Sequence, residues 1–356
     1  MTPAPAPQPF GSRPRTVPFL PAQAARARAG ARADGSAARR VERPAGSPGD
    51  GGRVRVWSPS RPLSVASTLS SLRRGSTDPC MRFEPGELVW WATRTPDGPA
   101  LLRLWPRPRL GEVEATAWGE GADWVLDGVP ELLGEHDDPS SFEPRPEHQR
   151  LVEALRARPG WRVPRTRAVF EALVPAALEQ RVTGREARRS WRTLVVKYGE
   201  PAPGPGHAAG LYVPPAAGVW RQIPSWVWLK AGVDEARRRA IISASQVAGR
   251  LEETLDLPHA EAANRLRTLP GVGIWTAAEI RQRAHGDADA FSWGDFHVAR
   301  NVSFALTGRV LDDVGCAEVI ECYRGHRYRV QRLLEMASAG RPRRAPRMTL
   351  PSHLPR

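Results

Sequence analysis

The feature that most constrains the fold is a Pro- and Gly-rich break between two short amphipathic helices. Residues 266–280 read LRTLPGVGIWTAAEI, and apolar residues three and four apart on both sides of the break predict two helices. Gly271 and Gly273 allow the backbone to turn tightly and another chain to approach closely. The amides that open the second helix then point outward, which is the geometry that binds a phosphate. The residues expected at this interface are Leu269, Gly271, Val272, Gly273 and Thr276.

The distribution of charge supports a polyanionic partner only in part. The 356 residues carry a net charge of +14, but +6 of this falls in residues 1–53 and +5 in residues 339–356. Residues 54–142 carry −4, and residues 143–338, which contain the helical break, carry +7. The excess in this last segment favours a nucleic acid as the partner.

Composition and hydrophobic periodicity divide the chain into four parts. Residues 1–53 contain almost no branched apolar or aromatic residue and are expected to be a disordered leader. Residues 54–142 hold short alternating runs between turn residues, together with one helical stretch, and predict a small α+β domain. Residues 143–338 have helical periodicity throughout and predict an all-α domain. Residues 339–356 are expected to be a basic disordered tail.

Cysteine usage and hydropathy exclude several classes of protein. Cys80, Cys316 and Cys322 form no CxxC pair, which fits neither a disulfide framework nor a tetrahedral zinc site. No apolar run approaches the ~18 residues of a membrane span, and residues 1–30 lack the apolar region of a signal peptide. We expect a cytoplasmic monomer that does not associate with membranes.

The segment LPGVGIWTA resembles the hairpin of the helix-hairpin-helix DNA glycosylase superfamily. Asp295, in AFSWGDFHVAR, follows Gly273 by 22 residues, a spacing similar to that of the DNA-3-methyladenine glycosylase II family. The resemblance covers roughly residues 54–338, and the hairpin with its aspartate is the more specific part. It implies an α+β N-terminal domain followed by an all-α helix-hairpin-helix glycosylase domain.

The resemblance makes Asp295 the candidate catalytic residue. Breaking an N-glycosidic bond builds positive charge on the deoxyribose, and a fixed anion in a dry pocket stabilises that charge. The carboxylate also orients or deprotonates the attacking water. An alternative is that Asp295 only caps the helix that follows it, and the two roles are compatible.

Trp275 stands where bifunctional members of the superfamily carry a lysine that forms a Schiff base with the sugar. No lysine follows Lys230, so the resemblance implies hydrolysis without strand cleavage. An indole here is expected to form a wall on which the extruded base stacks, unless it is simply a core tryptophan. We assign Glu279 and Trp293 to the same base pocket. Exposure on the helix, or a salt bridge with Arg283, is the alternative for Glu279.

Two further segments resemble DNA-contacting parts of the superfamily. Within VFEALVPAALEQRVTGREA, Gln180 and Arg181 match the tip that fills the gap left by the extruded nucleotide. The family enzyme has an apolar wedge at the position of Arg181, so it stays open whether Arg181 intercalates or pairs with phosphate. For the whole tip, the alternative is a solvated helix end. Residues 323–334 resemble the closing helix of the fold. Its basic residues are expected either to contact phosphate or to brace the Asp295 helix, and a solvated basic face is the alternative. These residues are Arg324, His326, Arg327 and Arg329.

The implied activity is hydrolysis of the N-glycosidic bond of an alkylated purine, 3-methyladenine first, in damaged double-stranded DNA at the nucleoid. Only Cys316 and Cys322 follow the hairpin, so no iron–sulfur cluster is expected. No other cofactor is expected, although a monovalent cation at the hairpin is left open. Two alternatives remain: a glycosylase for hypoxanthine or 8-oxoguanine, and a non-catalytic helix-hairpin-helix DNA-binding protein.

Overall fold

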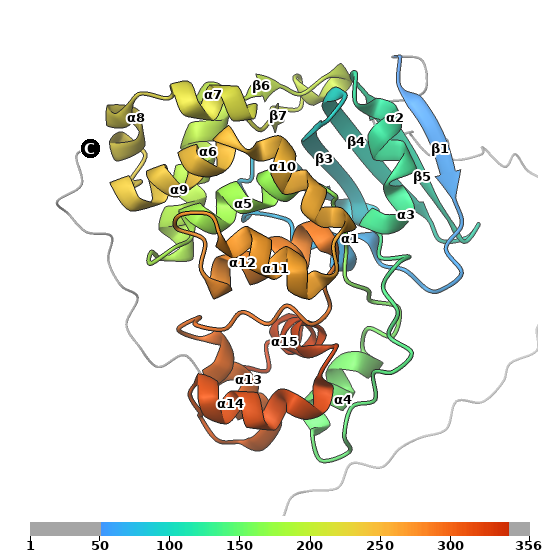
Figure 1. Cartoon of the computed structure of the whole chain (residues 1–356). Coiled ribbons are helices and arrows are strands. Elements are labelled where there is room, and N and C mark those ends of the chain that lie inside the picture. The colour runs from blue at the N-terminus through green and yellow to red at the C-terminus, as the bar shows by residue number, and fades with distance from the viewer. Residues whose placement is uncertain (1–50, 342–356) are drawn as a thin grey trace, which may run out of the picture. The chain divides into compact units, whose positions relative to one another are not determined.

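A computed structural model describes residues 51–341 of the chain. The disorder expected of the leader and the tail therefore falls almost entirely outside the described residues. Within residues 51–341 an antiparallel sheet with short helices is followed by a helical part, which confirms the predicted fold class (Figure 1). No helix in this range is long and apolar enough to cross a bilayer.

The N-terminal part is a five-stranded antiparallel sheet in the order β1-β5-β4-β3-β2. One face is covered by short helices, and their apolar residues share a core with Val89 and Leu102 of the central strands. Residues 200–213 cover the other face, where Trp90 and Trp118 stack with ring centroids 5.9 Å apart. The elements are β1 (Arg53–Trp57), α1 (Val65–Leu69), β2 (Met81–Glu84), β3 (Leu88–Thr95), β4 (Gly98–Arg107), β5 (Glu112–Trp118), α2 (Ala122–Asp127) and α3 (Val129–Leu132).

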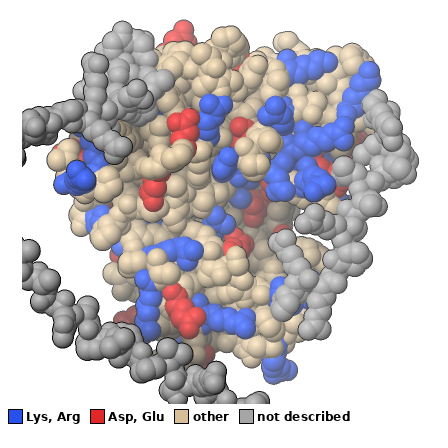
Figure 2. Space-filling model, turned by 180° about the vertical axis from the view of Figure 1, so that it is seen from behind, with Lys and Arg blue, Asp and Glu red and all other residues tan. Residues whose placement is uncertain are grey.

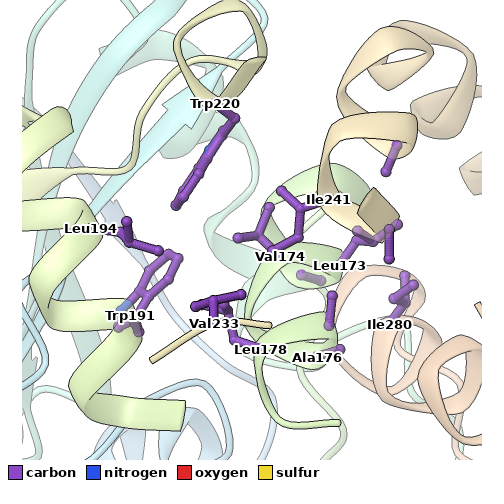
Figure 3. Packing of buried hydrophobic residues seen from close by; sticks show 14 of the residues in the cluster. Leu173, Val174, Ala176, Leu178, Trp191, Leu194, Trp220, Val233, Ile241 and Ile280 are labelled. Atoms are coloured by element: carbon purple, nitrogen blue, oxygen red, sulfur yellow. The ribbon is translucent and has the colours of Figure 1, made fainter. Parts of the chain in front are cut away.

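The helical part contains two hydrophobic cores. The first surrounds α5, whose sequence VFEALVPAAL is apolar on almost every side and is buried from Val169 to Leu178, except at the partly exposed Phe170 and Glu171 (Figure 3). The elements around this first core are α5 (Val169–Leu178), α6 (Gly184–Tyr198), β6 (Glu200–Pro201), β7 (Tyr212–Val213), α7 (Ala217–Gln222), α8 (Ser225–Lys230), α9 (Glu235–Gln246), α10 (Ala248–Glu252), α11 (His259–Arg267) and α12 (Ile274–Ile280), which continues as a π-turn to His285.

The second core joins segments that lie far apart in the sequence. It contains α4 (Gln149–Arg156), α13 (Val298–Thr307), α14 (Asp313–Ile320) and α15 (Arg327–Met336). Leu151 and Ala154 of α4 pack against α13 and α15 rather than against α5, which follows α4 in the sequence (Figure 1). The sequence predicts a single helical domain over residues 143–338, whereas these helices enclose two separate cores.

A largely buried carboxylate, that of Glu171, joins the sheet to the first helical core and makes stability depend on pH. Glu171 Oε2 accepts hydrogen bonds from Thr93 Oγ1 at 2.8 Å and from the Arg94 amide at 3.1 Å. Burial raises the pKa of Glu171 to about 7 despite these two bonds. Between its unfolded pKa, near 4.5, and 7 the folded state binds more protons than the unfolded state, so the stability that Glu171 provides is present at low pH and is lost as the pH rises.

We expect this site to lower the free energy of unfolding by up to about 3 kcal/mol between pH 4.5 and pH 7.5. Urea unfolding of wild type and Glu171→Gln at several pH values measures the effect, because the variant should lack this part of the pH dependence. Glu143→Gln, at an exposed position, is the matched control and should keep the wild-type slope. Identical slopes for wild type and Glu171→Gln would contradict the prediction.

Candidate active site

A polar cavity of about 290 Å³ lies where the two helical cores and the N-terminal part meet. This volume is at the small end of ligand pockets. The walls come from four places. They are α12 with its π-turn, Asp295 and α15 from the second core, the loop 70–74 that follows α1, and the end of α5 with the start of α6, which contribute Glu179 and Arg188. A second hollow of about 300 Å³ opens on the other side of Asp295, beside Phe296 and Arg300, but Trp275 does not line it.

Asp295 both caps α13 and lines the cavity with Trp275. Its Oδ1 accepts hydrogen bonds from the amides of His297 at 2.7 Å and Val298 at 3.0 Å. Its Oδ2 accepts no hydrogen bond from any residue between 51 and 341. Asp295 therefore caps α13 with one carboxylate oxygen and keeps the other oxygen free.

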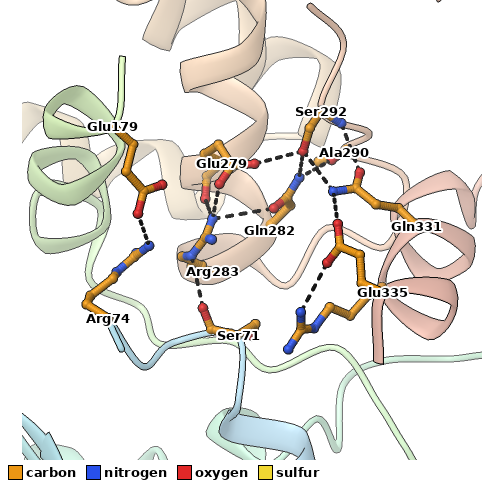
Figure 4. A network of polar contacts seen from close by, with 11 residues as sticks. Ser71, Arg74, Glu179, Glu279, Gln282, Arg283, Ala290, Ser292, Gln331 and Glu335 are labelled. Atoms are coloured by element: carbon orange, nitrogen blue, oxygen red, sulfur yellow. Dashed lines mark hydrogen bonds and ion pairs between the residues drawn. The ribbon is translucent and has the colours of Figure 1, made fainter. Parts of the chain in front are cut away.

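Ser292 fixes the turn that places Asp295. The Ser292 hydroxyl donates to Glu279 Oε1 at 2.7 Å and accepts from the side-chain amides of Gln282 at 2.8 Å and Gln331 at 3.0 Å (Figure 4). The Ser292 carbonyl accepts a hydrogen bond from the Asp295 amide at 3.2 Å. Two separate segments, α12 with its π-turn and α15, thus hold this turn, and nothing in the sequence around Ser292 signals the arrangement.

Glu279 is buried in the cavity wall, where both of its oxygens are engaged. Oε2 pairs with Arg283 Nη1 at 2.8 Å, and Oε1 accepts from Ser292. Burial works to raise the pKa of Glu279, but the charge of Arg283 and the hydrogen bond from Ser292 outweigh it and hold the pKa below its ordinary value. Of the two alternatives for Glu279, the salt bridge with Arg283 forms, and exposure of the side chain on the helix does not occur. Glu279 lies in the wall of the cavity as a paired anion.

The structure brings one of the two predicted pocket tryptophans to the cavity. Trp275 is half-buried and lines the cavity, and its Nε1 is buried without a hydrogen-bond partner. Trp293 does not line the cavity: its ring packs 4.3 Å from that of Phe291, at the edge of the second core. The structure places the Trp293 ring at the second core and not in the wall of this cavity, so it gives no support to the assignment of Trp293 to the base pocket.

The hairpin has the predicted shape, with two changes in the roles of its residues. Gly271 has φ +81°, and a Cβ there would lie 2.8 Å from the Ala240 Cβ, so a glycine is required. Gly271 and Gly273 are exposed and Leu269 is half-buried, whereas the side chains of Val272 and Thr276 are buried. The Thr276 hydroxyl lies inside and accepts a hydrogen bond from Gln180, so Thr276, like Val272, has only its backbone left for a contact with DNA.

The predicted tip between α5 and α6 is joined to the hairpin. Gln180 Nε2 donates to the Gly271 carbonyl at 2.8 Å and to Thr276 Oγ1 at 2.9 Å. Arg181 is exposed, has φ +56°, and has no side-chain partner among the described residues. A positive φ is uncommon for a long side chain. The chain then enters α6 through a capping box between Thr183 and Glu186.

The exposed face of α6 extends from this tip and is basic. Its exposed bases are Arg185, Arg188, Arg189, Arg192 and Lys197. Figure 2 shows basic side chains gathered on one part of the rear face, with few acidic ones among them. Such a surface suits a polyanion.

The bases of the α15 region brace the fold instead of facing outward together. Arg329 is buried and pairs with Asp137, and His326 is buried and bonds to Ser141. Phosphate contact by Arg329 and His326 is therefore excluded. Arg324 and Arg327 are paired with Glu321 and Asp289, respectively.

No site for a metal is evident in the part of the chain that the structure describes. Residues 51–341 contain no group of three or more His, Cys, Asp or Glu side chains placed to hold an ion. Cys80 and Cys316 are buried free thiols, and Cys322 is an exposed one.

Comparison in sequence links part of the chain to a DNA repair protein. No known family model matches the chain. Over 159 residues it is 35% identical to a probable bifunctional transcriptional activator/DNA repair enzyme AlkA of Mycobacterium tuberculosis, a stretch that is 41% of this chain and 31% of that protein. The chain thus spans about a third of the length of the curated relatives it matches.

Comparison with solved structures shows the fold. The 3-methyladenine DNA-glycosylase from Archaeoglobus fulgidus aligns over 80% of this chain and 98% of its own, with a TM-score of 0.63 and 16% identity. The apo-form of the Clostridium acetobutylicum 8-oxoguanine glycosylase/lyase aligns over 77% and 92%, with a TM-score of 0.58 and 12% identity. The chain therefore has the fold of the helix-hairpin-helix DNA glycosylase superfamily, within which it resembles the DNA-3-methyladenine glycosylase II family.

Proposed function

We propose that the chain is a monofunctional DNA glycosylase that extrudes a damaged purine from double-stranded DNA and hydrolyses its N-glycosidic bond. The observation that carries this proposal is that Asp295, in the turn before α13, and Trp275, on α12, line the same cavity beside the hairpin. A non-catalytic DNA-binding hairpin needs no such cavity and no aspartate with a free oxygen.

In the proposed reaction the bond between the purine and C1′ breaks, and its electron pair leaves with the base. Positive charge builds on the deoxyribose, and the Asp295 carboxylate stabilises it. Water adds to C1′ and its proton is lost through Asp295, which leaves an abasic site. A cationic alkylated purine leaves as the neutral base, whereas a neutral purine takes up one proton as it leaves. Trp275 supplies the face on which the extruded base stacks. No lysine follows Lys230, so we propose no Schiff base and no strand cleavage.

The proposed DNA interface consists of the hairpin and the tip that Gln180 fastens to it. The exposed glycines of the hairpin let a phosphate approach the backbone, and Arg181 lies where the gap left by the extruded nucleotide must be filled. The partner is damaged duplex DNA at the nucleoid, and we propose that the protein acts as a monomer without a cofactor.

Two classes of damaged purine are candidate substrates for the cavity. The resemblance to DNA-3-methyladenine glycosylase II favours a cationic alkylated purine, 3-methyladenine first, whose glycosidic bond is already weakened. The charged and amide side chains that line the cavity favour a neutral oxopurine, hypoxanthine or 8-oxoguanine, that forms hydrogen bonds with them. The absence of a lysine at the position of Trp275 argues against 8-oxoguanine as the substrate, so hypoxanthine is the second candidate.

The test is base release from methylated duplex DNA and from duplexes with a single hypoxanthine, with abasic sites assayed before and after alkali. We expect free base in at least one case, with strand breaks only after alkali. Strand breaks without alkali would contradict the monofunctional assignment. Tight duplex binding without release from methylated, deaminated or oxidised DNA would leave only a DNA-binding module.

A further inference from the structure

The loop of residues 70–78 carries side chains from the N-terminal part into the cavity. Its turn is closed by Asp78, whose carboxylate accepts from the Arg74 amide at 2.6 Å, the Cys80 amide at 3.0 Å and Trp191 Nε1 at 3.2 Å. Arg192 Nη1 on α6 donates to the Thr77 carbonyl at 3.0 Å. The loop is thus held against the first helical core at several points, and its position at the cavity is defined.

Arg74 is the residue of this loop that enters the wall of the cavity. Its side chain is 10% exposed and lies between Glu179 and the Glu279–Arg283 pair (Figure 4). The guanidinium donates one hydrogen bond within the described residues, to Glu179 Oε1 at 3.4 Å. A guanidinium has five N–H donors, so most of its donors are uncommitted. Burial, and after it the charge of Arg283, lower the pKa of Arg74. A bound hydrogen-bond acceptor opposes this lowering, because it stabilises the charged guanidinium.

The other polar groups of the cavity show the same excess of donors. Both oxygens of Glu279 are engaged, and Glu335 accepts from Gln331 Nε2 at 3.0 Å and Arg332 Nη1 at 3.1 Å. Within residues 51–341 the buried lining atoms without a partner are Trp275 Nε1, Arg73 Nε, Arg332 Nε and the Ser71 hydroxyl, of which three only donate. The free acceptors of the lining include Oδ2 of Asp295, the oxygen that the proposed reaction uses. A base that offers acceptors to the remaining donors therefore satisfies this part of the cavity.

We propose that Arg74 is a specificity-determining residue of the cavity, which favours a neutral purine with a carbonyl at C6, such as hypoxanthine, over a cationic alkylated adenine. This inference rests on the proposed glycosylase function. Arginine donates to the O6 and N7 acceptors of a 6-oxopurine in a two-pronged geometry. The same fixed positive charge disfavours a purine that is itself cationic.

The experiment measures kcat/KM for release of hypoxanthine and of 3-methyladenine by the full chain, as wild type, Arg74→Met and Arg74→Lys. Arg74→Met should lower the ratio of hypoxanthine to 3-methyladenine release on the order of tenfold. Arg74→Lys keeps the charge beside Glu179 but lacks the fork of donors, so its hypoxanthine release should also fall while 3-methyladenine release does not rise. Arg324→Met, an exposed arginine outside the cavity, is the matched control and should keep the wild-type ratio.

The outcomes separate this inference from the function on which it rests. If wild type releases a base and the ratio is unchanged in both Arg74 variants, Arg74 does not set specificity and the inference is overturned. If Arg74→Met unfolds, as its thermal melt would show, Arg74→Lys decides the question by the same criterion. If wild type releases neither base, the proposed glycosylase function is wrong, and the proposed role of Arg74 in specificity is wrong as well.

Discussion

Asp295→Asn is expected to lower the rate of base release by at least about 10²–10³-fold, because in the proposed reaction the substitution removes the negative charge that stabilises the developing sugar cation. Asparagine keeps an oxygen that can accept from the amides of His297 and Val298, so α13 should keep its cap. Duplex affinity and the melting temperature should consequently stay close to those of wild type. Single-turnover base release, DNA binding and a thermal melt measure the three quantities.

The matched control for this prediction is Asp312→Asn. Asp312 caps α14 by accepting from the Gly315 amide at 2.9 Å and does not line the cavity with Trp275. The control should retain base release, which shows that the exchange of a capping aspartate for asparagine does not by itself abolish activity. Asp295→Asn with a release rate within a few-fold of wild type would mean that the residue is only a cap.

Arg329→Met is expected to lower the free energy of unfolding by about 3–5 kcal/mol, because it leaves a buried carboxylate without its charged partner. Arg329 and Asp137 are 2% and 5% exposed, and their two hydrogen bonds measure 2.9 and 2.5 Å. Asp137 keeps only the bond from the Val163 amide at 2.8 Å. The measurement is equilibrium urea unfolding at neutral pH.

Arg324→Met provides the comparison for this pair. Arg324 and Glu321 are 75% and 48% exposed, and an exposed ion pair contributes about 1 kcal/mol or less. The two variants lose the same kind of side chain from neighbouring positions, so the difference between them isolates burial. Similar losses of stability in both would show that the Arg329–Asp137 pair is not the buried anchor that its geometry indicates.

Much of the fold can be predicted from the sequence because its signals are local. The break at Leu269–Gly273 needs only two glycines and flanking periodicity, and the change from alternating to helical patterns separates the N-terminal part from the helices. The cap at Asp295 is local as well, since it bonds to amides two and three residues ahead. The fold class, the hairpin and a cavity beside Asp295 follow from these signals.

The remaining features depend on partners that are distant in the sequence. Periodicity indicates that one face of α4 is buried but not that its partners are α13 and α15. Arg74 meets Glu179 across 105 residues, and no pattern around Arg74 distinguishes it from other loop arginines. The position of Trp293 depends on distant partners as well, because an aromatic side chain close to Asp295 in the sequence fits a core as well as a pocket.

The division of the second core between α4 and α13–α15 has a consequence for biosynthesis. Roughly 140 residues separate α4 from α13, and at a translation rate of about 5–20 residues per second α4 leaves the ribosome roughly ten to thirty seconds before its partners exist. Its apolar face remains open to chaperones during that time, while the first core can already assemble. Under the proposed function, a nascent chain therefore gains base-excising activity only once α15, which lines the cavity, has been made.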